Sequence, residues 1–314
     1  MTRYRQMTRG KAIAVSFVAA LAAACVVSAN ADTTPPSDLD PASCLQLVRS
    51  AVANEVAATN DNSKHMFHSR RQTPQGSQTR LYVETREAMA GMTISYNDKP
   101  LSPDQLEGEK NRLAGLASSP EQLRRKRSQE QENADRTLRI VKELPNAFLY
   151  QYDGEESGTT ALGEPGVRLV RLKFTPNPAY QPPSRIELVL VGMQGVLVVD
   201  PAARRIALID GTLFKEVSFG WGILGHLDKG GHFLVEQRDV GNRCWEVSHM
   251  SLSLTGKILL FKNLSYKSDE VFSDFRSVPP NTTFAQGGQM LTEEEAQLAQ
   301  NRSSVTLKSQ SPPQ

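Results

Sequence analysis

The chain has 314 residues, of which 39% are hydrophobic and 22% are charged, and its formal net charge is +2 at pH 7. This composition is typical of a folded globular protein and excludes a collagen-like or fully disordered chain. The near balance of charges gives no electrostatic basis for binding phosphate backbones, so we expect no nucleic-acid partner.

Residues 1–31 have the three parts of an export signal. Four basic residues precede an apolar run over 12–27, and small residues at 29–31 end the segment; the basic residues are Arg3, Arg5, Arg9 and Lys11. We interpret 1–31 as a cleavable signal peptide, because the apolar run is shorter than the roughly 20 residues that a membrane span needs. Its removal takes away four positive charges and leaves 2 − 4 = −2. The sequence therefore predicts an exported protein, periplasmic or extracellular.

The three cysteines offer two further possibilities. Residues 21–25, "LAAAC", are a degenerate lipobox, so an alternative to the secreted protein is a membrane-anchored lipoprotein with its lipid on Cys25. Cys44 and Cys244 remain in the mature chain, where an oxidising compartment permits a disulfide between them. Both also lie in apolar patterns, in which a free buried cysteine is common.

A helix and a strand hairpin are expected after a disordered linker over 32–37. Asp40 is a suitable N-cap, and proline follows at the first helical position. Apolar residues then recur at spacings of three and four, which predicts a helix of about 18 residues; they are Leu45, Val48, Val52 and Val56. The segments 64–72 and 78–86 are typical of a hairpin, and 91–101 of a third strand or turn.

Residues 102–145 form a helical insertion with a repeated start signal. Ser102 and Ser119 are each followed by proline and, three residues on, by glutamine, which predicts helices that begin at 103 and 120. We expect the second helix to end at 144, to dock by its apolar C-terminal half and to extend its charged half into solvent. The basic cluster 124–127 then has two interpretations, a solvated helix face or a contact with an anionic surface.

Strand patterns occupy 146–284, including 184–200, and links as short as 200–204 demand antiparallel neighbours. The predicted fold is therefore mainly β (α+β). We expect one domain over 38–286, built from a curved antiparallel sheet, or half-open β-barrel, of about 8–10 strands with an N-terminal helix and the two-helix insertion. Residues 287–314 are expected to be a disordered tail after at most a short helix.

The stretch "FGWGILGHLDKGGHF" at 219–233 contains five glycines and two histidines. A phosphate-binding loop needs the spacing GxxxxGK[ST], whereas Lys229 precedes its glycines. Glycines at strand ends are better explained by bulges and tight turns at the rim of a bent sheet. The apolar residues of the stretch become candidates for binding an apolar ligand; they are Phe219, Trp221, Ile223, Leu224 and Phe233.

No catalytic, cofactor-binding or metal-binding motif is found. The chain lacks GxSxG, CxxC and HExxH patterns, so we expect no enzyme. His65 and His68 lie in a predicted strand and point to opposite faces, which disfavours a shared metal. A minor alternative is an unrecognised hydrolase that uses His226 or His232 with Asp228.

Several segments together resemble an uncharacterised family of secreted bacterial proteins; they include "LPNAFLYQYDGEE", "GVLVVDPAARRIALIDGTL" and the glycine-rich stretch. The strand architecture is similar to the half-open β-barrel of the outer-membrane lipoprotein-sorting carriers (LolA-like). That resemblance implies a curved sheet partly closed by helices, but it transfers no binding residue.

Export, a bent sheet and alternating apolar side chains together predict a non-enzymatic protein of the cell envelope. We expect it to bind a lipid or a lipoprotein in the concavity of the sheet. The alternative is a protein-protein interaction scaffold whose concavity is filled by its own helices and whose charged helix 120–144 recruits an envelope partner. Contact with a membrane surface is expected only if Cys25 is lipidated.

Overall fold

The computed structural model describes residues 39–59, 62–220, 224–258 and 262–309. The predicted signal peptide and linker therefore lie outside the described residues, together with Cys25, Trp221 and Ile223.

The described residues form four α-helices, one 3-10 helix and thirteen strands. The helices are α1 (Pro41–Ala58), α2 (Pro103–Ala117), α3 (Pro120–Ala147), η1 (Glu187–Gly192) and α4 (Phe284–Ser309). The strands of the N-terminal part are β1 (Lys64–Thr73), β2 (Gly76–Val83), β3 (Ala90–Tyr96) and β4 (Lys99–Pro100). Those of the central and C-terminal parts are β5 (Phe148–Ser157), β6 (Arg168–Pro176), β7 (Met193–Asp200), β8 (Arg205–Leu213), β9 (Val217–Phe219), β10 (Gly225–Leu227), β11 (His232–Asp239), β12 (Trp245–Ile258) and β13 (Lys262–Val278).

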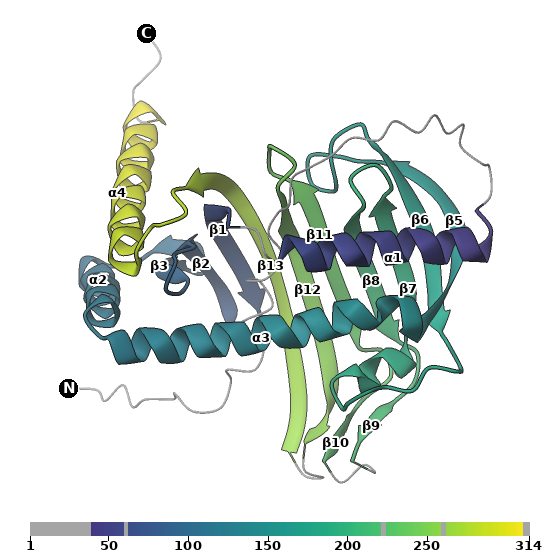
Figure 1. Ribbon diagram of the computed structural model, residues 1–314. Coiled ribbons are helices and arrows are strands. Elements are labelled where there is room, and N and C mark those ends of the chain that lie inside the picture. The colour runs from purple at the N-terminus through teal and green to yellow at the C-terminus, as the bar shows by residue number, and fades with distance from the viewer. Residues whose placement is uncertain (1–38, 60–61, 221–223, 259–261, 310–314) are drawn as a thin grey trace.

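All thirteen strands belong to one antiparallel sheet with the order β4-β3-β2-β1-β13-β12-β11-β8-β7-β6-β5, and the short pair β9 and β10 extends β12. The two ends of this order, β4 and β5, do not pair, so the curved sheet stays open (Figure 1). The predicted fold class is thereby confirmed. The strand number exceeds the expected 8–10 because β4, β9 and β10 are pieces of only two or three residues.

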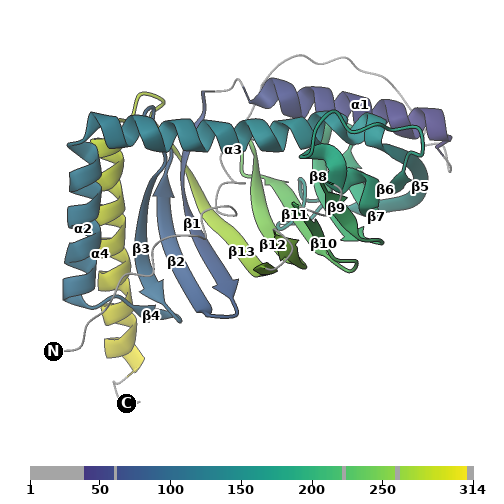
Figure 2. The same cartoon turned by 90° about the horizontal axis from the view of Figure 1, so that it is seen from below.

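Two helices lie across one face of the sheet, which we call the inner face. Figures 1 and 2 show α1 and α3 side by side over the strands β5 to β8, with α3 running on toward α2 at the other end of the sheet. Asp40 caps α1 by accepting hydrogen bonds from the backbone of Ala42 and Ser43, so this helix begins where predicted. The first core forms beneath the two helices.

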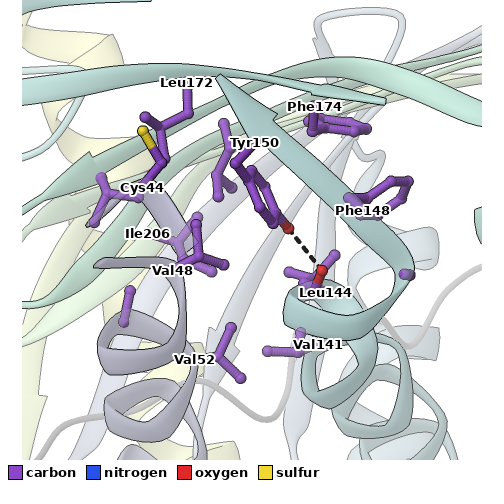
Figure 3. Packing of buried hydrophobic residues seen from close by; sticks show 14 of the residues in the cluster. Cys44, Val48, Val52, Val141, Leu144, Phe148, Tyr150, Leu172, Phe174 and Ile206 are labelled. Atoms are coloured by element: carbon purple, nitrogen blue, oxygen red, sulfur yellow. Dashed lines mark hydrogen bonds between the residues drawn. The ribbon is translucent and has the colours of Figure 1, made fainter. Parts of the chain in front are cut away.

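Figure 3 shows how this core is packed. Val48 and Val52 of α1 lie opposite Val141 of α3, and the rings of Phe148 and Tyr150 enter from β5. The Tyr150 hydroxyl donates a hydrogen bond of 2.7 Å to the carbonyl of Leu144 in the last turn of α3. That carbonyl is one of the acceptors that a helix end leaves free, so the bond ties α3 to the sheet.

A second core lies at the other end of the sheet, where α2 and α4 pack on β2 and β3. Phe284 and Leu291 of α4 are 2% and 0% exposed. The prediction of a disordered tail over 287–314 is wrong as far as Ser309, because these two side chains complete an apolar core with Leu81 and Met92 of the sheet. The segment after residue 284 has few apolar residues, which is why the sequence did not indicate this packed helix.

The insertion begins as predicted, at Pro103 and Pro120, but differs in its extent and packing. The second helix continues through Pro145 to Ala147. Its charged half also touches the protein, since Leu123 packs on the second core and Glu130 accepts a hydrogen bond of 3.1 Å from the Met89 backbone N–H. The expected free extension into solvent is corrected accordingly.

The segment 184–200 is a strand only from Met193 onward. Residues 187–192 form η1 instead, since its Leu190 packs into the first core and the segment contacts α3.

The two cysteines of the described chain are free, buried and far apart along the sheet. Cys44 lies in the first core at the β5 end, whereas Cys244 directly precedes β12. Five strand steps separate β5 from β12, or on the order of 20 Å at the usual strand spacing, and a disulfide needs α-carbons within about 7 Å. The predicted Cys44–Cys244 bridge is therefore not formed.

Candidate ligand-binding cavity

A cavity of about 570 Å³ opens between the inner face of the sheet and α3. Its lining comes from α1, α3, η1 and the strands β5 to β13, and most of the side chains are apolar. The apolar lining includes Ile140, Val141, Ile186, Val189, Met193, Ile209, Phe219, Leu227, Phe233, Val235, Val247, Met250, Leu252, Leu254 and Leu264. This volume is in the range of pockets that hold small molecules.

The strands supply their share of the lining by ordinary alternation. Leu252 and Leu254 of β12 stand two residues apart and face the cavity, as do Phe233 and Val235 of β11. Gly211 of β8 pairs with Phe233 in the sheet, and a β-carbon at Gly211 would meet the Met193 Cε atom at 2.5 Å. The absence of a side chain at Gly211 thus leaves room for neighbours that form the wall.

Helix α3 closes the cavity by one face of its C-terminal half. Thr137, Ile140, Val141 and Leu144 recur at spacings of three and four and therefore share one side of the helix. Val141 and Leu144 are also part of the first core. The same face that anchors α3 to the sheet thus forms the roof of the cavity.

The apolar side chains of β11 and β12 around the cavity are only partly buried by the protein itself. Val235, Val247, Met250 and Leu252 remain half-buried and stand outside the three apolar cores of the described chain. Helices α1 and α3 pack on part of the inner face over β5 to β8, but they leave the inner face over β11 and β12 open.

The predicted ligand-binding residues have three different outcomes. Phe219 at the end of β9 and Phe233 of β11 line the cavity. Leu224 is 37% exposed and is not among the described residues of the lining. Trp221 and Ile223 lie outside the described residues. The described parts of the glycine-rich stretch form the β9–β10 hairpin and the start of β11, beside the cavity.

One wall of the cavity is polar and carries a buried ion pair. Glu55 of α1 is 0% exposed and accepts hydrogen bonds from Arg205 Nε at 3.0 Å and from the backbone of Ile206 at 2.9 Å. Burial raises the pKa of Glu55, and Arg205 opposes that shift. Glu55 and its neighbours Gln237 and Glu246 all line the cavity and each has a buried oxygen without a hydrogen-bond partner.

Glu246 also belongs to a buried cluster behind this wall. The two nitrogens of the His65 ring face different partners: Nδ1 lies 3.1 Å from Glu246 Oε1, and Nε2 lies 3.7 Å from Cys244 Sγ. Glu84 Oε2 is 3.8 Å from the same Nδ1. Burial lowers the pKa of His65, but its hydrogen bond with Cys244 and its contact with the Glu246 carboxylate outweigh this and raise the pKa to about 10.

The two carboxyl groups of this cluster are close enough to disfavour each other's ionisation. Burial, reinforced by the charge of Glu246, raises the pKa of Glu84 to about 7. The pKa of Glu246 is also raised by burial, against the opposing effect of His65.

The histidines that sequence reasoning had considered together are separated. His226 lies 3.3 Å from Asp228, as the hydrolase alternative required, but His232 pairs with Asp210 of β8 at 2.7 Å. His65 and His68 both lie on β1. The carboxylate of Glu216 lies beside His226 and Asp228, and it accepts a hydrogen bond of 2.9 Å from the hydroxyl of Ser218, the strand partner of His226.

A second cavity of about 400 Å³ lies between β2, β3 and α2. Its charges are largely paired with one another: Arg112 contacts Glu109 at 2.9 Å, and Lys126 contacts Glu130 at 2.7 Å. This leaves the larger cavity as the more apolar of the two and as the better ligand site.

Comparisons with protein families, curated proteins and solved structures found no relative of this chain. No family model, no curated protein and no solved structure matches the chain. Over the residues that the structure describes, none of the helices combines the length and the apolar character that crossing a membrane requires. The residues of the cavity and of the cluster are therefore interpreted from their own geometry.

Sequence reasoning missed the polar wall and the cluster behind it. Glu55 could have been noticed in the sequence, because it is a charged residue three positions after Val52 on the apolar face of α1. His65 and Cys244 are 179 residues apart and left none, because only the sheet order brings them together.

Proposed function

We propose that this protein binds an apolar ligand, such as a lipid or the acyl chain of a lipoprotein, in the cavity beneath α3. The observation that carries the proposal is the row of half-buried apolar side chains of β11 and β12, which face a cavity of about 570 Å³. Covering them with a ligand gains about 25 cal/mol for each Å² of apolar surface removed from water.

The polar wall fits the same proposal. An amphiphile has a polar group as well as a chain, and Glu55 and Gln237 each offer a buried oxygen without a partner. A hydrogen-bond donor on the ligand would satisfy these acceptors while its chain covers the apolar strands.

The scaffold alternative receives less support. It required the helices to fill the concavity, but α1 and α3 fill one part of it and leave the other open. The charges of α3 are also partly engaged within the helix, where Lys126 pairs with Glu130 and Arg136 with Glu132. No described feature of α3 favours a partner protein over solvent.

The test is displacement of a dansyl-labelled fatty acid from the purified protein, with native mass spectrometry of protein purified from its own host. Val235→Trp places a large ring in the cavity and should weaken binding at least about ten-fold. The matched control is Val271→Trp on β13, where the side chain is 47% exposed and lies outside the cavity lining. Equal binding by both variants would contradict the proposal, as would a ligand-free protein that binds no probe.

A further inference from the structure

We propose that His65, Cys244, Glu246 and Glu84 form a binding site for a divalent transition metal of the zinc class, between β1 and β12. One atom from each of the first three residues lies within 4.8 Å of the others. The set joins an imidazole, a thiol and a carboxylate, which are the three ligand types that Zn²⁺ takes in proteins. This inference does not rest on the proposed ligand-binding function.

The spacing of the ligand atoms suits one tetrahedral ion. With metal bonds of about 2.0 Å to nitrogen or oxygen and about 2.3 Å to sulfur, neighbouring ligand atoms lie roughly 3.3–3.6 Å apart. His65 Nδ1 lies 3.1 Å from Glu246 Oε1 and 3.8 Å from Glu84 Oε2, whereas Cys244 Sγ lies 3.7 Å from the other ring nitrogen, Nε2. Because one ion binds only one of the two ring nitrogens, the His65 ring or the Cys244 side chain must rotate to bring the thiol and the carboxylates to the same ion.

Two polar atoms at this position have no hydrogen bond. His65 Nδ1 and Glu246 Oε1 are both buried without a hydrogen-bond partner, although they are 3.1 Å apart. His65 itself is 4% exposed. Buried polar atoms are nearly always satisfied, because leaving one unpaired costs about 1–3 kcal/mol. An ion coordinated by both atoms would satisfy them together.

The charge of the site also favours a cation. Two buried carboxylates and a thiol converge here, and Glu84 and Glu246 have side chains that are only 15% and 12% exposed. Lys64 and Arg205 moderate these charges from outside the cluster. A divalent ion would neutralise the carboxylates directly, at the distance where the interaction is strongest.

The same residues could suggest a nucleophilic cysteine with a histidine base and an orienting carboxylate. The surroundings argue against it: Cys244 is 7% exposed and lies outside the described lining of the cavity, so a substrate bound there does not meet the thiol. A metal ion is small enough to reach this buried site, whereas the carbonyl group of a substrate is not.

The structure contains a natural control. Glu216, His226 and Asp228 also bring ligand atoms within 4.8 Å of one another, but they lie at the surface and include no thiol. This exposed cluster should bind metal weakly, and it allows the buried site to be distinguished by the presence of sulfur.

The test uses the full chain, stripped of metal by a chelator under reducing conditions and titrated with CoCl₂ and then with ZnCl₂. We expect one Co²⁺ per chain, a thiolate-to-cobalt charge-transfer band in the near ultraviolet, and displacement of the cobalt by Zn²⁺. Cys244→Ser should abolish the band, whereas Cys44→Ser and His226→Ala should keep it. Glu246→Gln should weaken Zn²⁺ binding at least about ten-fold.

A variant that is damaged in its fold is recognised by circular dichroism, and the wild-type protein then supplies a second measurement. Bound Zn²⁺ should slow alkylation of Cys244 and raise the melting temperature. Absence of the charge-transfer band at saturating Co²⁺ would overturn the proposal. So would a band that persists in Cys244→Ser, or metal binding that only His226→Ala removes.

Discussion

Glu55 of α1 and Arg205 of β8 are 150 residues apart in sequence, yet they form an ion pair of 3.0 Å in which neither side chain is more than 3% exposed. The guanidinium also lies 5.7 Å from the centre of the Trp245 ring, and its Nη2 atom is buried without a partner. The pair therefore fixes the C-terminal end of α1 to the central strands beside the cavity.

Glu55→Gln should destabilise the protein by about 3–5 kcal/mol, because it leaves the buried guanidinium of Arg205 without a counter-charge. Equilibrium unfolding in urea measures this. The double variant Glu55→Leu with Arg205→Met removes both charges, so its cost should be well below the sum of the two single changes. Additive costs would contradict the view that the charges compensate each other.

The free thiols lead to a second prediction. Cys44 is 0% exposed and Cys244 is 7% exposed, so neither should react quickly with iodoacetamide in the folded protein. In denaturant without reductant, the chain cleaved after residue 31 should take up two adducts by intact mass, and Cys44→Ser should take up one. A chain that takes up adducts only after reduction would restore the disulfide that the sequence had suggested.

His249 makes stability depend on pH. Burial lowers its pKa, but hydrogen bonds and charge from Asp269 at 2.9 Å and Glu236 at 3.0 Å raise it above the usual 6.5. The folded state thus favours the protonated ring, and this contribution is fully present below about pH 6.5 and is lost as pH rises through the raised value. The difference in urea midpoint between wild type and His249→Gln should therefore shrink from pH 6 toward alkaline pH. A constant difference would contradict the prediction.

Two glycine-to-alanine substitutions should have opposite effects on the free energy of unfolding. A β-carbon at Gly195 of β7 would lie 1.9 Å from the carbonyl oxygen of Asp210 on β8, so backbone must move and we expect a loss of about 1–3 kcal/mol. A β-carbon at Gly108 of α2 meets nothing within 4 Å, so alanine should stabilise by about 0.5–1 kcal/mol through helix propensity. Thermal unfolding of both variants provides the comparison, and a stabilising Gly195→Ala would contradict the close packing of β7 on β8.

Local signals were sufficient for the elements but not for their assembly. Asp40 with Pro41 and Ser102 with Pro103 predicted helix starts that the structure confirms, because capping depends on neighbouring residues alone. The strand alternation and the turn at 200–204 likewise predicted antiparallel pairing. The anchored helix α4 was missed, because its two core residues matter only through a hairpin that is far away in sequence.

In the candidate sites, too, local sequence signals predict single residues but not the contacts between residues that are distant in sequence. Phe219 and Phe233 could be selected from composition, and both line the cavity. The polar wall and the His65–Cys244–Glu246 cluster depend on pairing between strands that no periodicity reveals. The C-terminal half of α3 was expected to dock on the sheet. That it also lines a cavity could not be predicted, because this depends on the curvature of the sheet.

The position of β13 between β1 and β12 constrains the order in which the chain can fold. Lys64 of β1 pairs with Val278 of β13, a separation of 278 − 64 = 214 residues, and the core on β2 and β3 is completed by Phe284 and Leu291. The first hairpin therefore has neither its neighbouring strand nor its apolar cover until the last part of the chain is present. Strand pairings between residues so far apart in sequence form slowly. Strands β1 to β3 are therefore synthesised early but should be among the last parts of the sheet to fold stably.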